Sequence, residues 1–310
     1  AERDRELRPP EEKPLVSIVI PSRNRCNLLP RAVRSVLNQT YRNIEVIIVD
    51  DASTDGTPRA IRELSEQDQR VRGLRNDQPL GGGAARNVGI QAARGKYIAF
   101  LDDDDEWLPR KLERQVPLAN DYSVVGCPGV VAEGYRLAGV RMTNKNRLKL
   151  ADDGSPRTTV ITLNDYCYHT RFCPSVILAK AASLRRIGGY DETLVASQGR
   201  DLLLRMAKTF GPMIAVEEPL VLHYVTHGKH RITDSPAHLE GGWREFQKNG
   251  PDMPTGARRL RKCALCLKEY KRAKGGKERI AWFFRALACV SPLSPLRFAR
   301  VFAIQLLVSR

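Results

Sequence analysis

Residues 95–109 read GKYIAFLDDDDEWLP, and this stretch decides the fold. Tyr97–Leu101 is a short apolar run of the kind that forms a buried strand, and it ends at four aspartates, Asp102–Asp105. Neighbouring carboxylates ~4 Å apart repel one another by ~4 kcal/mol per pair at an effective dielectric near ~20, so they favour a bound cation. Hard oxygen ligands at such a place suit Mg²⁺ or Mn²⁺; the alternatives are a solvated acidic turn and a helix N-cap.

Upstream of this stretch, apolar runs alternate with helical patterns. Strands are expected at Leu15–Ile20, Ile44–Val49 and, more weakly, Val71–Leu74, with helices at Leu28–Leu37, Thr57–Leu64 and Ala84–Ala93. This alternation predicts βαβ units around a parallel sheet, whose ligands bind beyond the carboxyl ends of the strands. Three polar clusters fall at such ends, at residues 21–25, 50–55 and 102–105.

A run of three glycines, Gly81–Gly83, precedes Arg86 and Asn87 near an expected helix start. Glycine-rich turns and helix N-termini bind phosphate through backbone N–H groups, and an arginine adds a bidentate fork. The run lacks the spacing of the common nucleotide-binding glycine motifs, so a flexible turn with a solvated arginine is the alternative interpretation.

Composition and charge narrow the class of protein. The 310 residues carry a formal charge of +16, which predicts an anionic partner. Residues 241–310 hold 16 Lys and Arg against 4 Asp and Glu, whereas residues 1–240 hold 35 and 31. The sequence contains no run of 18 apolar residues, so no membrane-spanning helix is expected. The segment Ala1–Pro14 is too charged for a signal peptide.

The seven cysteines are scattered along the chain, which favours reduced thiols of a cytosolic protein over a disulfide framework. Cys263 and Cys266 form a lone CxxC, a weak zinc signal because tetrahedral zinc needs four ligands. We therefore expect these two cysteines to pack as small apolar side chains.

The ordered motifs together resemble a family. The segments PSRNR, VDDASTDGT, GGGAARNVG and GKYIAFLDDDDEWLP, followed by RRIGGYDETL, RDLLLRMAKTF and EPLVLHYVTHGKHRIT, are similar to those of the family 2 inverting glycosyltransferases with the GT-A fold. The resemblance covers roughly residues 15–233. It implies an α/β fold with a Rossmann-like, mostly parallel central sheet flanked by helices, and a C-terminal helical extension.

The resemblance also implies a division of the chain. Residues 1–14 are expected to be an N-terminal extension and residues 15–240 the glycosyltransferase domain. Within that domain, residues 15–105 correspond to the nucleotide-binding half and residues 106–240 to the acceptor half. Residues 241–310 are expected to form a basic helical region.

The family's site roles transfer to matching positions. Pro21, Ser22, Arg23 and Arg25 would line the nucleotide pocket, with Arg23 stacking on the base. Asp51 would accept a hydrogen bond from uracil, and Arg86 would lie near the pyrophosphate or the base. Asp102–Asp104 would be the DxD motif, in which Asp104 binds Mn²⁺ or Mg²⁺, Asp102 faces the donor sugar and assists the metal, and Asp103 lies in the donor pocket. His227 resembles a histidine near the pyrophosphate or metal; a structural role is the alternative.

One position departs from the family pattern. Where many members carry the aspartate that deprotonates the acceptor hydroxyl, this chain has Gly199 in the segment SQGRDL. A local shift could bring Asp201 into that role, although an aspartate in a first helical turn also has a structural explanation through the helix dipole. Alternatively, the acceptor is acidic or supplies its own base, or the protein binds donor and turns over poorly.

The resemblance thus predicts a hexosyl or N-acetylhexosaminyl transferase. It would move sugar from a nucleotide-diphospho-sugar, with UDP expected, to an acceptor hydroxyl by metal-dependent single displacement with inversion. The acceptor would be a glycan, a lipid-linked molecule or another hydroxyl compound of surface polysaccharide or glycoconjugate assembly.

Two other enzyme or binding classes fit less well. A nucleotidyltransferase would show a glycine-rich signature with a basic residue after the first strand, where this chain has PSRNR. A nucleic-acid-binding module is suggested by charge alone, without the interleaved aromatic and basic residues of single-strand binders, so no nucleic-acid partner is expected.

The basic tail predicts a further partner. Basic and apolar residues alternate at helical spacing in Leu260–Leu267 and Ile280–Val290, and Phe298–Val308 shows a similar pattern. Such helices suit an anionic membrane surface, and a packed extension with a solvated basic face is the alternative. We therefore expect a cytoplasmic protein, peripheral on the cytoplasmic face of the membrane if the tail binds lipid.

Overall fold

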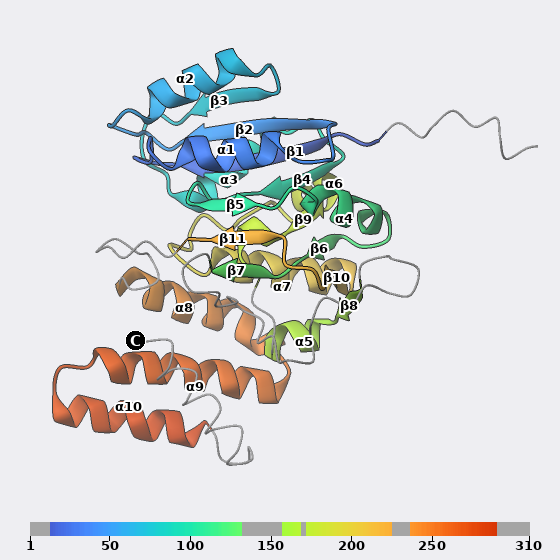
Figure 1. The fold of residues 1–310 in the computed structure, drawn as a ribbon. Helices are drawn as coiled ribbons and strands as arrows, with labels where there is room; N and C mark the ends of the chain where they lie inside the picture. Colours follow the sequence, from blue (N-terminus) through green and yellow to red (C-terminus); the bar gives the residue numbers. More distant parts are fainter. Residues whose placement is uncertain (1–12, 132–156, 169–171, 225–235, 290–310) are drawn as a thin grey trace, which may run out of the picture.

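The computed structural model describes residues 13–131, 157–168, 172–224 and 236–289. Its larger sheet contains β1 (Val16–Ser22), β2 (Ile44–Asp50), β3 (Val71–Arg75), β4 (Tyr97–Phe100), β6 (Val124–Gly126), β8 (Thr158–Ile161), β9 (Leu178–Lys180) and β10 (Met213–Val216). These eight strands lie in the order β3-β2-β1-β4-β9-β6-β10-β8 (Figure 1). The predicted α/β fold is confirmed.

The first half of this sheet, β3-β2-β1-β4, is entirely parallel, as the alternation of strands and helices predicts. Every residue of β2 and β4 is buried, which explains their continuous apolar runs. The second half is mixed, because β9 pairs antiparallel with both β4 and β6, and β8 pairs antiparallel with β10. The sheet is therefore parallel only where the sequence pattern is strongest.

A second sheet of three strands, in the order β5-β11-β7, crosses the middle of the molecule. It consists of β5 (Asp105–Trp107), β7 (Gly129–Val131) and β11 (Val221–His223). Its strands are three residues long, too short for a periodic signal. The acidic run that follows β4 thus continues into a second strand at Asp105.

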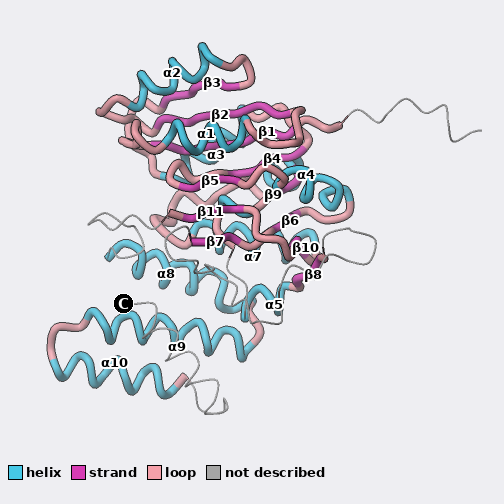
Figure 2. The backbone as a smooth tube through the Cα atoms, viewed as in Figure 1, coloured by secondary structure: helices cyan, strands magenta, loops and turns pink. Residues whose placement is uncertain are grey.

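Helices cover both faces of the larger sheet. Helix α1 (Leu29–Leu37) lies in front of it and α3 (Gly82–Ala92) behind it in the view of Figure 2. The other helices around the two sheets are α2 (Thr57–Gln67), α4 (Lys111–Gln115), α5 (Leu163–Tyr168), α6 (Ala181–Arg186), α7 (Gln198–Phe210) and the short 3-10 turns η2 (Val116–Asn120) and η3 (Pro174–Val176).

Three helices follow these elements: α8 (Pro236–Asn249), α9 (Thr255–Arg272) and α10 (Gly276–Ala288), with the 3-10 turn η5 (Gly250–Asp252) after α8. The helical character expected for the C-terminal region holds throughout its described part. Helix α8 runs through residue 241, so the change in charge composition falls inside a helix. Its Glu245 is fully buried and pairs with Arg200 of α7 and Arg261 of α9.

The C-terminal helices contain a small apolar cluster of their own. Cys263, Cys266, Leu267, Ala286 and Cys289 are buried together between α9 and α10. All seven cysteines are free. The CxxC residues therefore pack as apolar side chains, as expected.

Candidate active site

The carboxyl ends of β1, β2 and β4 bring the three predicted polar clusters together. After β1, the backbone N–H of Asn24 donates to Ser53 Oγ at 2.9 Å, and Asn24 Oδ1 accepts from the N–H of Thr54 at 2.8 Å. The backbone N–H of Arg25 donates to Thr57 Oγ1 at 2.9 Å. The loop of residues 21–25 is thus bonded to the loop that follows β2.

Asp51 joins the end of β2 to the segment that leads into α3. Its buried carboxylate accepts hydrogen bonds of 2.8 Å from Asn76 Nδ2 and from the backbone N–H groups of Leu80 and Gly81. An ionised carboxylate has about four acceptor positions, so this arrangement leaves about one for a ligand. The family resemblance implies that Asp51 binds a base, and no pattern in the sequence indicates its three protein donors.

The first two of the four consecutive aspartates have partners of their own. Asp102 forms an ion pair with Arg86 of α3, and its backbone N–H donates to Ser175 Oγ at 3.0 Å. Asp103 accepts a hydrogen bond of 2.7 Å from Ser22 Oγ at the end of β1, and burial raises its pKa to about 7. The structure therefore brings Ser22, Arg86, Asp102 and Asp103 together, as the sequence analysis expects.

Asp104 differs from its neighbours. Its carbonyl oxygen accepts a hydrogen bond of 2.8 Å from Arg31, but within the described part of the chain its carboxylate forms no ion pair. Burial raises the pKa of Asp104, and the adjacent Asp105 and Asp102 raise it further. A half-buried carboxylate beside others, with no ion-pair partner among the described residues, is an oxygen donor that suits a divalent metal ion.

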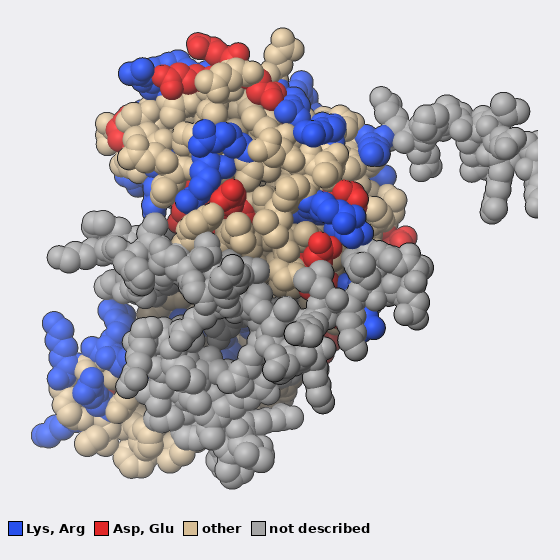
Figure 3. All heavy atoms as spheres, viewed as in Figure 1, with Lys and Arg blue, Asp and Glu red and all other residues tan. Residues whose placement is uncertain are grey.

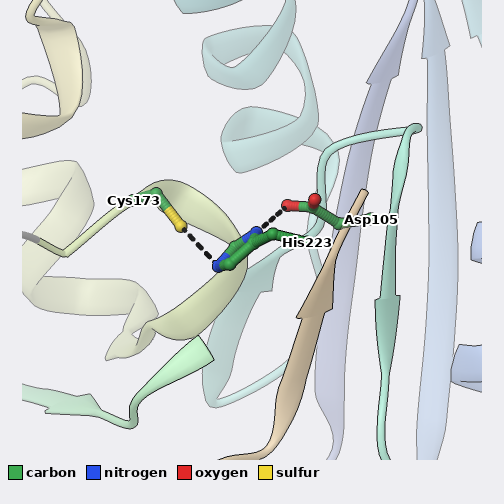
Figure 4. A group of neighbouring side chains, drawn as sticks. All are labelled: Asp105, Cys173 and His223. Atoms are coloured by element: carbon green, nitrogen blue, oxygen red, sulfur yellow. Dashed lines mark hydrogen bonds and ion pairs between the residues drawn. The ribbon is translucent and has the colours of Figure 1, made fainter. Parts of the chain in front are cut away.

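Asp105 begins β5 and has a different set of partners from the first three aspartates. Its Oδ2 accepts hydrogen bonds from Ser175 Oγ at 2.5 Å and from His223 Nδ1 at 2.9 Å. His223 Nε2 lies 3.6 Å from Cys173 Sγ (Figure 4). Burial by itself would lower the pKa of His223, but the hydrogen bonds to Asp105 and Cys173 raise it to about 11.

Ser175, Cys173 and His223 are absent from the predicted site. They lie 70, 68 and 118 residues after Asp105 in the chain, in a loop and in a short strand. No local spacing or periodicity links residues so far apart. Strand pairing sets His223 opposite Asp105, and the turn η3 brings Ser175 and the preceding Cys173 to the same two side chains.

Helix α7 borders the site at its N-terminus. A Cβ at Gly83, in the glycine run, would lie 2.5 Å from Gln198 Nε2, so the start of α3 packs directly on the start of α7. A Cβ at Gly199 would lie 3.8 Å from the ring of Pro174, an ordinary contact. Gly199 therefore stands between the glycine run and the Cys173–Ser175 loop, with space for a side chain.

Asp201 lies deeper in α7 and is fully buried. Its carboxylate pairs with Arg205 at 2.8 Å and with Lys248 of α8 at 2.8 Å, and it accepts a hydrogen bond of 3.0 Å from Asn249 Nδ2. These partners tie α7 to α8 and support the structural explanation of Asp201 over the role of base. His227 lies outside the described residues.

Backbone strain gathers around the same site. Among the described residues, the non-glycine residues with positive φ are Asn24, Ala52 and Ser197, at 54°, 54° and 61°. They follow β1, follow Asp51 and precede α7, respectively. Such conformations cost ~1–3 kcal/mol each and persist where the surrounding structure enforces them, often at functional sites.

The comparisons with known proteins agree with this geometry. Residues 17–173 match the family described as glycosyl transferase family 2. The Escherichia coli K12 protein named for colanic acid biosynthesis, the glycosyl transferase WcaA, is 33% identical over 77% of this chain and 82% of its own length. The chain belongs to glycosyl transferase family 2. It is accordingly a glycosyltransferase.

Further relatives are similar over shorter lengths or in fold. The Escherichia coli glucosyltransferase WfgD, named for UDP-Glc and α-D-GlcNAc-diphosphoundecaprenol, is 42% identical over 34% of this chain and 40% of its own length. The crystal structure of Staphylococcus aureus TarS residues 1–349 with UDP-GlcNAc matches with a TM-score of 0.68 and 16% identity, over 92% of this chain and 83% of that one. The shared GT-A fold follows from that likeness.

Proposed function

We propose that this family 2 glycosyltransferase moves a sugar from a UDP-sugar to an acceptor hydroxyl by single displacement with inversion, in polysaccharide or glycoconjugate assembly. One observation carries the proposal. The end of β4 carries Asp102 and the Asp104 carboxylate, and helix α3 sets Arg86 against Asp102 at that edge of the sheet. The UDP-GlcNAc bound by TarS and the UDP-Glc in the name of WfgD support the choice of UDP.

Each group then has a physical task. Asp51 offers its remaining acceptor position to the base, and the loop 21–25 lines the nucleotide pocket. Arg86 is held by Asp102 beside the place where the diphosphate would lie, so its charge is ready to offset the negative charge that develops on the leaving group. The Asp102 carboxylate is also positioned to accept hydrogen bonds from the donor.

Asp104 and Asp102 would hold Mn²⁺ or Mg²⁺. The oxygen donors present fit these hard ions, and the half-buried Asp104 carboxylate forms no ion pair among the described residues, although the charge of Arg25 lowers its pKa. When bound, the ion supplies Lewis-acid stabilisation of the departing nucleoside diphosphate.

The acceptor proton needs a different account. Gly199 has no side chain to take it, and the partners of Asp201 occupy both carboxylate oxygens. We infer that the chain contributes binding, orientation and leaving-group stabilisation. The hydroxyl proton would then pass to a basic group of the acceptor or to water. The same observations support the alternative of a donor-binding protein with weak transferase activity.

A thermal unfolding experiment tests the donor site directly. The full chain is melted with UDP, GDP, dTDP or CDP, each with and without Mn²⁺. Ligands that bind only the folded state stabilise it, by ~2.7 kcal/mol at a hundredfold excess over the dissociation constant. A rise in melting temperature that requires both UDP and Mn²⁺ supports the proposal. No rise with any nucleotide would overturn the assignment of this site.

The acceptor side of the proposal rests on α10. Ile280, Phe284 and Leu287 are 59%, 60% and 42% exposed and recur at helical spacing along one stripe. Lys and Arg side chains gather at the nearby tip of the α9–α10 hairpin (Figure 3). None of the helices in the described part of the chain combines the length and apolar character that crossing a bilayer requires.

We infer that this stripe contacts an anionic membrane surface that presents a lipid-linked acceptor, of the kind in the name of WfgD. Anionic lipid attracts basic residues by ~1 kcal/mol each near the surface, and the apolar stripe would enter the headgroup region. The wild-type protein should sediment with vesicles of phosphatidylglycerol. The sedimenting fraction should fall in the Phe284→Glu variant, and it should fall for wild type at high salt. Equal capture by purely zwitterionic vesicles would refute the electrostatic part.

A further inference from the structure

We propose that Cys173 and His223, oriented by Asp105, form a binding site for a thiolate-preferring divalent ion of the Zn²⁺ class. This site is separate from the Mn²⁺ or Mg²⁺ site at Asp104, and it does not depend on the proposed transferase function. Thiolate and imidazole ligands favour zinc-like ions, whereas carboxylates and phosphates favour Mg²⁺ and Mn²⁺.

The distance between the two ligand atoms fits zinc. Cys173 Sγ and His223 Nε2 are 3.6 Å apart. Zinc bonds of ~2.3 Å to sulfur and ~2.0–2.1 Å to nitrogen, set at a tetrahedral angle, place the two ligand atoms ~3.6 Å apart. The pair can therefore share one ion with little movement of either side chain, and water or an external ligand would fill the other two positions of the tetrahedron.

Asp105 supplies the support that zinc-binding histidines usually have. Its Oδ2 accepts from His223 Nδ1 at 2.9 Å, which directs Nε2 toward Cys173 (Figure 4). A carboxylate on the distal nitrogen fixes the tautomer and orientation of a metal-binding imidazole. The hydrogen bond from Ser175 Oγ, at 2.5 Å, in turn holds the Asp105 carboxylate. A carboxylate oxygen of Asp105, Cys173 Sγ and a ring nitrogen of His223 all lie within 4.8 Å of one another.

The backbone around His223 holds the site in place. His223 is the register partner of Asp105 across the antiparallel pair β5 and β11. On its other side, a Cβ at Gly129 of β7 would lie 2.2 Å from His223 Nε2, so only glycine leaves room for the ring. Asp105 is buried, whereas Cys173 and His223 are half-buried, which gives an ion access to both ligands.

Binding would join the Cys173 loop to the DxD turn. Ser175, two residues after Cys173, accepts the backbone N–H of Asp102 and donates to Asp105. An ion held by Cys173 and His223 would therefore stiffen the segment that positions Asp102. A rise in melting temperature with Zn²⁺ is the expected consequence.

The first test uses Co²⁺ alone as a spectroscopic probe on the full chain. Thiolate-bound Co²⁺ gives a near-ultraviolet charge-transfer band, which oxygen ligands at Asp104 cannot produce. We expect this band in wild type and in the matched controls Cys26→Ser, whose cysteine is equally half-buried, and Asp104→Ala. Cys173→Ser should lose it, and Asp105→Asn should need ~10–100-fold more Co²⁺. A wild type without the band, or Cys173→Ser with it unchanged, overturns the proposal.

A second test needs no variant and so does not depend on folding. Iodoacetamide labelling of the wild type is followed by mass spectrometry of the Cys173 and Cys26 peptides, with and without Zn²⁺. Zinc should slow labelling of Cys173 at least tenfold and leave Cys26 unchanged. Equal labelling rates of Cys173 with and without Zn²⁺ would contradict the proposal. The nucleotide-dependent melting experiment tests the donor site independently of this result.

Discussion

The two halves of the large sheet differ in strand direction and strand length. In β3-β2-β1-β4 the strands are parallel and buried, and the groups that we assign to the donor follow their carboxyl ends. In β9-β6-β10-β8 the strands have three or four residues and mixed directions, and ion pairs join α7, α8 and α9, which lie on this side of the molecule (Figure 1). The donor site that we propose therefore depends on local strand–loop units, whereas the proposed acceptor side depends on contacts between distant segments.

The largest expected effect comes from removing the unpaired carboxylate of the parallel half. Asp104→Ala should lower metal-dependent turnover by ~10³-fold, since a bound metal is worth several kcal/mol of transition-state stabilisation. The fold should persist, because the carboxylate makes no ion pair among the described residues. Initial rates with Mn²⁺, alongside circular dichroism, measure both. Turnover equal to wild type would remove Asp104 from the metal site.

In the mixed half, Asp201 should act on stability. Asp201→Asn removes the charge that pairs with Arg205 and Lys248 in a buried position, so we expect a loss of about 3 kcal/mol in the free energy of unfolding. The pH dependence of the rate should keep its wild-type shape. Loss of one limb of the pH–rate profile, with little change in stability, would instead make Asp201 the base.

Between the halves, Lys111 of α4 is fully buried and lies 3.9 Å from the centre of the Trp107 ring. Burial lowers its pKa to about 8. Above pH 8 the unfolded chain keeps a proton that the folded chain has lost, so stability rises with pH until the unfolded lysine also titrates.

Lys111→Met should abolish this rise, which we expect to be about 2 kcal/mol between pH 8 and pH 10. Urea unfolding at several pH values measures it, with Lys13→Met as an exposed control. Parallel stability curves for wild type and Lys111→Met would show that Lys111 titrates normally.

The smallest expected effect on stability comes from Gly199, at the start of α7 beside the mixed half of the sheet. Gly199→Asp places a carboxylate where α7 meets the site, and its Cβ would make only an ordinary contact with Pro174. We expect stability within about 0.5 kcal/mol of wild type. Turnover should rise by roughly tenfold or more, since general bases contribute ~10²–10⁴-fold when well placed. Gly199→Asn is the uncharged control, and equal rates for the two variants would count against a missing base.

The parallel half was predictable because its signals are local. Apolar runs mark β1, β2 and β4 within a residue or two of their ends, and the aspartates beyond them are visible in the sequence. Parallel strands buried on both faces need such runs, and the carboxyl ends of neighbouring parallel strands meet at one edge. Ser22, Arg86, Asp102 and Asp103 accordingly come together as expected.

By itself, the sequence determined the α/β class, the strand ends that carry the polar clusters and the basic helical character of the C-terminal region. Tertiary structure alone decided that Asp51 is already bonded to three donors, that Asp201 joins α7 to α8, and that Asp105 meets His223 and Cys173. The physical reason is separation along the chain. A strand end is encoded by its neighbours, but the partner of a buried polar group is chosen by packing between segments that no local pattern connects.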